Sequence, residues 1–141
     1  MLRYSMMKLV KEFEISTGHR LPNHKGGCYN IHGHNYWVYI EIGFNIPDRY
    51  IEGKEGFLID FGDVKRIIND TFDHKFIAYE KDPFANILED LPGVVFVEYI
   101  PTAENMSLHM RNLIKDHLQK NGIKAVVNVQ LNETKFSKVS R

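Results

Sequence analysis

Residues 28–44 read CYNIHGHNYWVYIEIGF and contain the only cysteine, two of the seven histidines and a long alternating run. Side chains two positions apart in a strand lie on one face, so His32 and His34 share a face with Cβ atoms about 7 Å apart. Residues 34–44 are predicted to form a strand. The face that carries His34 continues with apolar side chains, namely Tyr36, Val38, Ile40 and Ile42. Two imidazoles placed this way can bind one cation.

An earlier segment, residues 8–19, also alternates and predicts a strand that ends in a third histidine, His19. Turn residues over 22–27 connect the two strands, which therefore predict an antiparallel pair. This pairing would bring His19 close to His32 and His34. A polar connection over residues 45–56 follows the second strand.

The second half of the chain predicts two helices and two short strands. The first helix runs from Asp60 or Asp63 as cap to Asp73, and the second runs from the cap Thr102 to 121–122. Strands are expected at 94–100 and 125–131. The order β, β, α, β, α, β predicts an α+β fold with mostly antiparallel neighbours, formed by residues 1–141 as one domain.

Two helices cover only one face of a four-stranded sheet. Both faces of residues 34–44 are nevertheless apolar or aromatic, since Trp37 and Tyr39 alternate with Val38 and Ile40. We therefore expect the helix-free face to pack on another subunit in a homo-oligomer.

Composition limits the possible partners. Eighteen basic and eighteen acidic residues balance without long blocks, which argues against nucleic acid or an anionic membrane as partner. No apolar run approaches the roughly 18 residues of a membrane span, and residues 1–7 lack the apolar segment of a signal peptide. The lone cysteine forms no internal disulfide, so a cytoplasmic location and a small-molecule partner or a second copy are expected.

Three imidazoles from His19, His32 and His34 would make a catalytic type of metal site, whose fourth position stays open for water or substrate. Cys28 offers an alternative, because a thiolate as fourth ligand would close the site and make it structural. Cys28 follows two glycines and Lys25, a mobile and partly cationic setting that favours a reactive thiol acting as base or nucleophile. A buried structural cysteine is the other interpretation.

Further carboxylates and a histidine are candidates for the same chemistry. Asp73 beside His74 can fix the tautomer of the imidazole, although a solvated helix end explains the pair equally well. Glu104 and Glu133 can each accept paired hydrogen bonds from a guanidine-like edge, or serve as a helix-start and a strand-end charge.

These segments occur in one order along nearly the whole chain: residues 13–20, Cys28-x-x-x-His32-Gly-His34, Asp73-His74, Pro101-Thr-Ala-Glu104-Asn and Glu133-Thr134. In this order they resemble the family of 6-pyruvoyl- and 6-carboxy-tetrahydropterin synthases. The resemblance implies a tunnelling fold, with a four-stranded antiparallel sheet and two helices on one face. It also implies a barrel-forming oligomer, a hexamer built as a dimer of trimers, with sites between subunits.

The resemblance also implies roles. His19, His32 and His34 resemble zinc ligands, Cys28 the catalytic base, and Asp73 and His74 its relay partners. Glu133 resembles the anchor of the pterin amino-pyrimidine edge, and Glu104 a further substrate contact. Arg20, Lys25 and Lys75 either offer charge to a triphosphate or only aid solubility.

The three residues between Cys28 and His32 resemble the carboxy branch. That branch converts 7,8-dihydroneopterin triphosphate to 6-carboxytetrahydropterin, releasing acetaldehyde and triphosphate, on the way to queuosine. A pyruvoyl-forming enzyme and a non-catalytic zinc-stabilised pterin-binding module remain the alternatives. After Asp73-His74 the chain reads Lys-Phe-Ile-Ala where family members commonly have Lys-x-Leu-Asn, a departure that bears on substrate preference.

Overall fold

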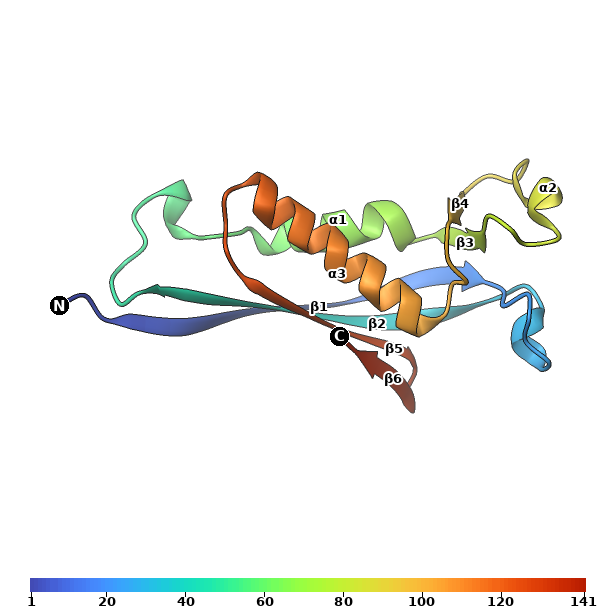
Figure 1. The fold of residues 1–141 in the computed structure, drawn as a ribbon, viewed down its shortest axis with the longest axis horizontal. Coiled ribbons are helices and arrows are strands. Elements are labelled where there is room, and N and C mark those ends of the chain that lie inside the picture. The colour runs from blue at the N-terminus through green and yellow to red at the C-terminus, as the bar shows by residue number, and fades with distance from the viewer.

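The computed structural model describes residues 1–141 apart from the side chain of Lys54. One curled sheet carries the helices on one side (Figure 1). The strands are β1 (Tyr4–His19), β2 (His32–Pro47), β3 (Lys75–Tyr79), β4 (Val94–Val97), β5 (Val126–Thr134) and β6 (Ser137–Ser140). The helices are α1 (Phe61–Phe72), α2 (Ala85–Leu88) and α3 (Ala103–Lys120), with short 3-10 turns η1 (Gly27–Tyr29) and η2 (Lys54–Gly56).

The long hairpin of β1 and β2 forms the centre of the fold, as the alternation predicts. The strands pair antiparallel along their whole length, from Tyr4 opposite Pro47 to His19 opposite His32. The predicted core face of β2 is buried, including Tyr36, Val38 and Ile40. The second strand extends three residues further than the alternation indicated, because residues 45–47 still pair with the start of β1.

Both predicted helices form. Of the two cap candidates for the first helix, Asp60 is the cap and Asp63 lies in the first turn, and Thr102 caps the second helix as predicted. Asp60 accepts a hydrogen bond from the Gly62 amide at 2.7 Å, and Thr102 accepts one from the Asn105 amide at 3.2 Å. Each helix buries one apolar stripe against the core, formed by Val64, Ile68 and Phe72 in α1 and by Met106, Met110, Ile114 and Leu118 in α3. The helices therefore seal the sheet face from which His19 projects.

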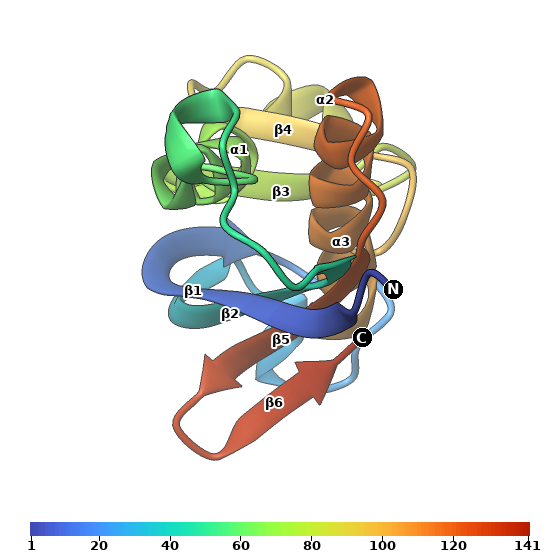
Figure 2. The same ribbon diagram turned by 90° about the vertical axis from the view of Figure 1, so that its left-hand side faces the viewer.

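The expectation of a four-stranded, antiparallel sheet is incomplete. The sheet has six strands in the order β4-β3-β1-β2-β5-β6, and two of its pairings, β1 with β3 and β3 with β4, are parallel. Figure 2 shows how β3 and β4 curl away from the central hairpin beside the helices. Neither additional strand has a strong local signal, because β3 has only five residues without strict alternation and β6 is a tetrapeptide with a single apolar residue, Val139.

The helix-free face of the sheet is exposed in the single chain. Trp37 is 42% exposed there, and its indole N–H donates to the Glu12 carboxylate at 3.1 Å. Among the described residues, no helix is both long and apolar enough to cross a membrane.

A partly buried hydrogen bond joins the segment before α3 to the helix itself. The Tyr99 hydroxyl and Nδ1 of His109 are hydrogen-bonded at 2.6 Å, and the His109 ring packs edge-on against Phe72. Burial lowers the pKa of His109 below its ordinary 6.5, and the nearby Glu98 only partly opposes this shift. Folding therefore favours the neutral form of His109 over the charged form.

Acidification should weaken this contact. Because the pKa of His109 is lower in the folded than in the unfolded chain, its contribution is complete above pH 6.5 and is lost as the pH falls below that value. Urea unfolding at pH 7.5 and 5.5 should show a loss in wild-type protein that exceeds the loss in His109→Gln by on the order of 1 kcal/mol, the contribution of one hydrogen bond. His117→Gln, on the same helix, is the control and should behave like wild type; equal losses in all three proteins would contradict the assignment.

Candidate active site and metal centre

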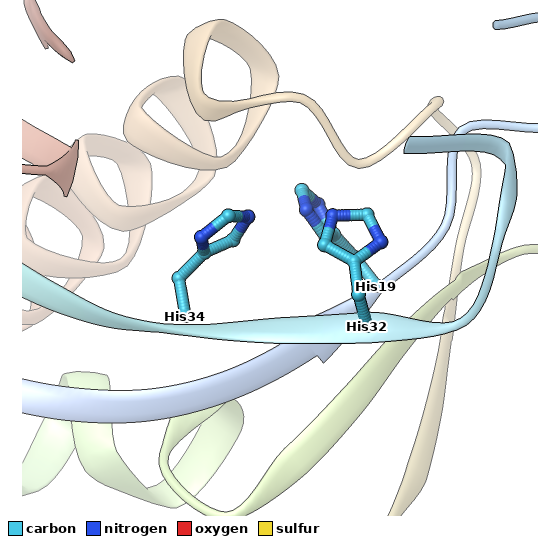
Figure 3. Close-up of side chains that lie close together, drawn as sticks. All are labelled: His19, His32 and His34. Atoms are coloured by element: carbon cyan, nitrogen blue, oxygen red, sulfur yellow. The ribbon is translucent and has the colours of Figure 1, made fainter. Parts of the chain in front are cut away.

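Three histidines meet where the central hairpin ends. In the β1–β2 register His19 lies opposite His32, and Thr17 lies opposite His34, so all three imidazoles project to one side of the two strands (Figure 3). Their ligand nitrogens lie within 4.8 Å of one another, and the ring centroids are 4.5 to 5.3 Å apart. The predicted approach of His19 to the HxH pair is confirmed.

Backbone carbonyls fix two of the tautomers. Nδ1 of His19 contacts the Pro101 carbonyl at 2.7 Å, and Nδ1 of His32 contacts the Asn30 carbonyl at 2.7 Å. A carbonyl only accepts, so each Nδ1 carries the proton and each Nε2 keeps a free lone pair. This arrangement is typical of histidines that bind a metal through Nε2.

The charge state also suits a cation. Burial lowers the pKa of both His19 and His34, which keeps these rings neutral near pH 7. In the described part of the chain, Nε2 of His32 and Nε2 of His34 are buried and have no hydrogen-bond partner. Buried polar atoms are normally satisfied, so the unpaired nitrogens, together with the donor chemistry, fit a bound metal ion.

Glu133 reaches this cluster from β5. Its Oε1 lies 3.2 Å from Nε2 of His34 and 3.4 Å from Nε2 of His19. The contact with His34 lacks hydrogen-bond geometry, which is why that nitrogen remains unpaired. Glu133 lies near the end of β5, where the sequence predicted a strand end. The direction of its carboxylate, toward the histidines, was not predicted.

Tyr36 is a residue of this region that sequence reasoning took only for core. Its hydroxyl lies 3.4 Å from both Nε2 of His19 and Oε1 of Glu133. Burial, followed by the charge of Glu133, raises the pKa of Tyr36, so the phenol stays protonated. The signal was available, because Tyr36 continues the strand parity of His32 and His34.

Cys28 lies in the short turn η1 between the two strands and is half-buried. The Leu21 amide, two residues after His19, donates to the Cys28 carbonyl at 2.8 Å, so the turn lies at the end of the hairpin that carries the histidines. The residue cluster able to hold one ion contains the three histidines without Cys28, among the residues described. The geometry thus gives the closed, four-ligand alternative no support.

Asp73 and His74 lie side by side after α1. Nδ1 of His74 contacts Asp73 at 3.0 Å, and the other Asp73 oxygen accepts from the Ser16 amide at 2.9 Å. Burial alone would raise the pKa of Asp73, but the hydrogen bonds from Ser16 and His74 outweigh it and lower the pKa. The His74 side chain is 82% exposed, and no hydrogen bond among the described residues joins it to Cys28.

The remaining candidates are not part of the three-histidine cluster, although Lys75 lines the same cleft as His34. Glu104 is exposed in the first turn of α3, three residues after the Pro101 that holds His19. Lys75 and His74 line a shallow cleft of about 440 Å³ together with residues 16–18 and 33–35. Arg20 was expected at the surface, but it is 3% exposed and forms an ion pair with Asp82. Its guanidinium is therefore paired within the chain rather than exposed to a ligand.

Comparisons with known proteins agree with this geometry. The family model of 6-pyruvoyl tetrahydropterin synthase matches residues 8–141. A 6-carboxy-5,6,7,8-tetrahydropterin synthase from Rickettsia felis is 33% identical over 136 residues, covering 92% of this chain and 95% of the relative. One from Haemophilus influenzae is 36% identical over 120 residues, covering 78% and 83%.

Solved structures show the same fold. An uncharacterized protein from Wolinella succinogenes superposes with a TM-score of 0.74 at 23% identity, covering 97% of this chain and 98% of that one. The 6-pyruvoyl tetrahydropterin synthase from Plasmodium vivax gives 0.68 at 19% identity, with 97% of both chains covered. With a family model that spans the three histidines and everything after them, the chain belongs to the 6-pyruvoyl tetrahydropterin synthase family.

Proposed function

We propose that this protein is a zinc-dependent lyase that converts 7,8-dihydroneopterin triphosphate to 6-carboxy-5,6,7,8-tetrahydropterin, with release of acetaldehyde and triphosphate. The observation that carries the proposal is the open cluster of three imidazoles beside a turn that holds the lone thiol. Relatives that carry the carboxy-tetrahydropterin name over most of the chain support this product rather than the pyruvoyl product.

His19, His32 and His34 would hold the metal through Nε2, since Nδ1 of His19 and of His32 is engaged with a carbonyl. When bound, zinc supplies a Lewis acid that acidifies the protons next to the side-chain oxygens of the substrate. Three protein ligands leave room for those oxygens, as catalytic zinc sites do. The neutral phenol of Tyr36 beside His19 can orient the same oxygens by hydrogen bonding.

Cys28 and His74 move the protons in this proposal. Cys28 acts as the base at the substrate side chain, and His74 acts as its partner acid and base. Asp73 accepts the Nδ1 proton of His74, which leaves Nε2 of the exposed imidazole available for exchange with substrate. Glu133 anchors the amino-pyrimidine edge by paired hydrogen bonds, after its carboxylate turns from the histidines toward the pterin, and Glu104 gives a further contact.

An assembly would complete the site. The Asp73-His74 pair faces solvent, and the helix-free face exposes Trp37. Both observations support self-association, and we propose, from the family resemblance, a homohexamer built as a dimer of trimers in which the relay pair of one subunit serves the thiol of another. We place the reaction in the cytoplasm, where the unpaired Cys28 stays reduced, and assign its product to queuosine biosynthesis.

Product analysis tests the reaction. Zinc-loaded protein incubated with 7,8-dihydroneopterin triphosphate under reducing conditions should yield 6-carboxytetrahydropterin by mass spectrometry and an equal amount of acetaldehyde. The cleavage removes two carbons of the side chain, so the masses of the two candidate products differ. A product that retains the three-carbon side chain, without acetaldehyde, would assign the pyruvoyl reaction instead, and no turnover would favour the binding module.

Replacement of the thiol separates catalysis from metal binding. Cys28→Ala should lower kcat by about 100-fold or more, the contribution typical of a positioned base, and retain one zinc per chain. Metal analysis after dialysis and steady-state kinetics measure the two effects, with His32→Ala as the control that loses zinc. Loss of zinc in Cys28→Ala would contradict the open three-histidine site.

The role of Glu133 is tested by its amide. Glu133→Gln loses the charge that strengthens paired hydrogen bonds, so KM for the pterin should rise by about tenfold or more, while the zinc content stays unchanged. Kinetics and metal analysis on the same preparation measure both quantities. A variant that loses zinc while KM stays at the wild-type value would make Glu133 a metal ligand rather than a pterin anchor.

A further inference from the structure

The residue directly after the metal-site histidine of β1 is a buried arginine. The guanidinium of Arg20 lies over two aromatic rings, with its central carbon 4.7 Å from the centroid of Tyr29 and 4.8 Å from that of Phe84. One Nη atom donates to Oδ1 of Asp82, and Nε donates to the Tyr29 carbonyl at 3.1 Å. We call Arg20, Tyr29, Asp82 and Phe84 the arginine clamp.

The carboxylate of the clamp is itself held in place. Oδ1 of Asp82 also accepts from the Phe84 amide at 2.8 Å, and the Asp82 carbonyl accepts from the Ala85 amide at 2.9 Å. These bonds rigidify the turn between β3 and α2. Within the described residues, Oδ2 of Asp82 is buried without a hydrogen-bond partner, so the charge of Arg20 is what offsets the burial of this carboxylate.

The other side of the clamp is the loop that carries the thiol. The Leu21 amide donates to the Cys28 carbonyl at 2.8 Å, and Arg20 holds the next carbonyl, that of Tyr29. Two successive backbone groups of the Cys28 turn are thus tied to the end of β1. Within the turn, the Tyr29 amide donates to the Gly26 carbonyl at 3.1 Å and the Asn30 amide donates to the Gly27 carbonyl at 3.0 Å, so the bonds from Leu21 and Arg20 attach a locally ordered turn to the rest of the fold.

We propose that Arg20 is a positioning residue, which anchors the Cys28 loop to the turn at Asp82 and thereby holds the thiol beside the histidine cluster. The inference rests on the proposed role of Cys28 in catalysis. It differs from a triphosphate-binding role, because the guanidinium contacts two aromatic rings and is paired with Asp82, with 3% of the residue exposed.

Lysine does not replace arginine in this setting. A planar guanidinium stacks on aromatic rings while its Nε and Nη atoms donate in different directions, whereas an ammonium is a point charge without a stacking face. Arg20→Lys therefore keeps the charge opposite Asp82 but loses the tie to Tyr29. This makes it the variant that separates charge from geometry.

The test must distinguish a variant that has lost the anchor from a variant that has failed to fold. Arg20→Met alone would leave the Asp82 carboxylate buried without a partner charge and could unfold the protein. The double variant Arg20→Met/Asp82→Asn is therefore measured as well. It removes both charges and keeps a side-chain oxygen that can accept from the Phe84 amide. Arg111→Met is the matched control, because Arg111 also donates from Nε to a backbone carbonyl, that of Val127 at 3.0 Å, on the α3–β5 side. Zinc content and the urea midpoint identify any variant that fails to fold.

The decisive measurement is alkylation of the lone thiol by iodoacetamide in zinc-loaded protein, followed by mass spectrometry. Loss of one charge-assisted hydrogen bond should raise the population of the released loop, so the alkylation rate should increase about tenfold in the double variant and in Arg20→Lys. Arg111→Met should react at the wild-type rate. Where turnover is present, kcat should fall about tenfold and KM should stay within about twofold, because the thiol rather than the binding surface is displaced.

Alkylation rates of folded, zinc-loaded Arg20 variants within about twofold of wild type would overturn the anchor, as would full kcat in Arg20→Lys. A raised KM with wild-type kcat and wild-type alkylation would instead return Arg20 to substrate binding. An inactive wild-type protein would refute the proposed function. Because alkylation does not require turnover, the alkylation rates would still test whether Arg20 anchors the Cys28 loop.

Discussion

The register of β1 against β2 is the constraint on which the rest of the structure depends. His19 lies opposite His32 only because the two long strands pair from Tyr4 and Pro47 onward without a slip. A shift by one residue would move every side chain of one strand to the other face. Burial of Val38 and Ile40 under the helices excludes that shift, so the hydrophobic core holds the three imidazoles together.

Sequence reasoning predicted the parts of the fold that carry a local signal. Alternation along β2 and the caps Asp60 and Thr102 depend on neighbours within a few residues, and these predictions are confirmed. The strands β3 and β6 have no such signal, because both are short: β3 is defined by its pairing with the distant strand β1 and with β4, and β6 by a hairpin with β5. The same limit explains the parallel pairings at one edge of the sheet.

The same distinction between local and long-range signals applies to the residues of the site. The histidines could be found because spacing and strand parity are local properties, and Tyr36 was available from that parity too. Arg20 could not be assigned from sequence, because arginine is usually exposed and its partner Asp82 lies 62 positions away. Glu133 was recognised as a site residue, but its approach to two imidazoles depends on the pairing of β2 with β5.

The contact of His19 with the Pro101 carbonyl couples two parts of the molecule that are usually considered separately. Pro101 precedes Thr102, the cap of α3, so the ring orientation of one ligand and the entry of a core helix share a single hydrogen bond. Thermodynamic linkage is reciprocal, so an ion that favours this orientation of His19 also favours the docked helix. Substitutions in the turn before α3 can therefore change metal affinity without touching any ligand, and the helix entry is a place where selection can adjust how tightly the ion is held.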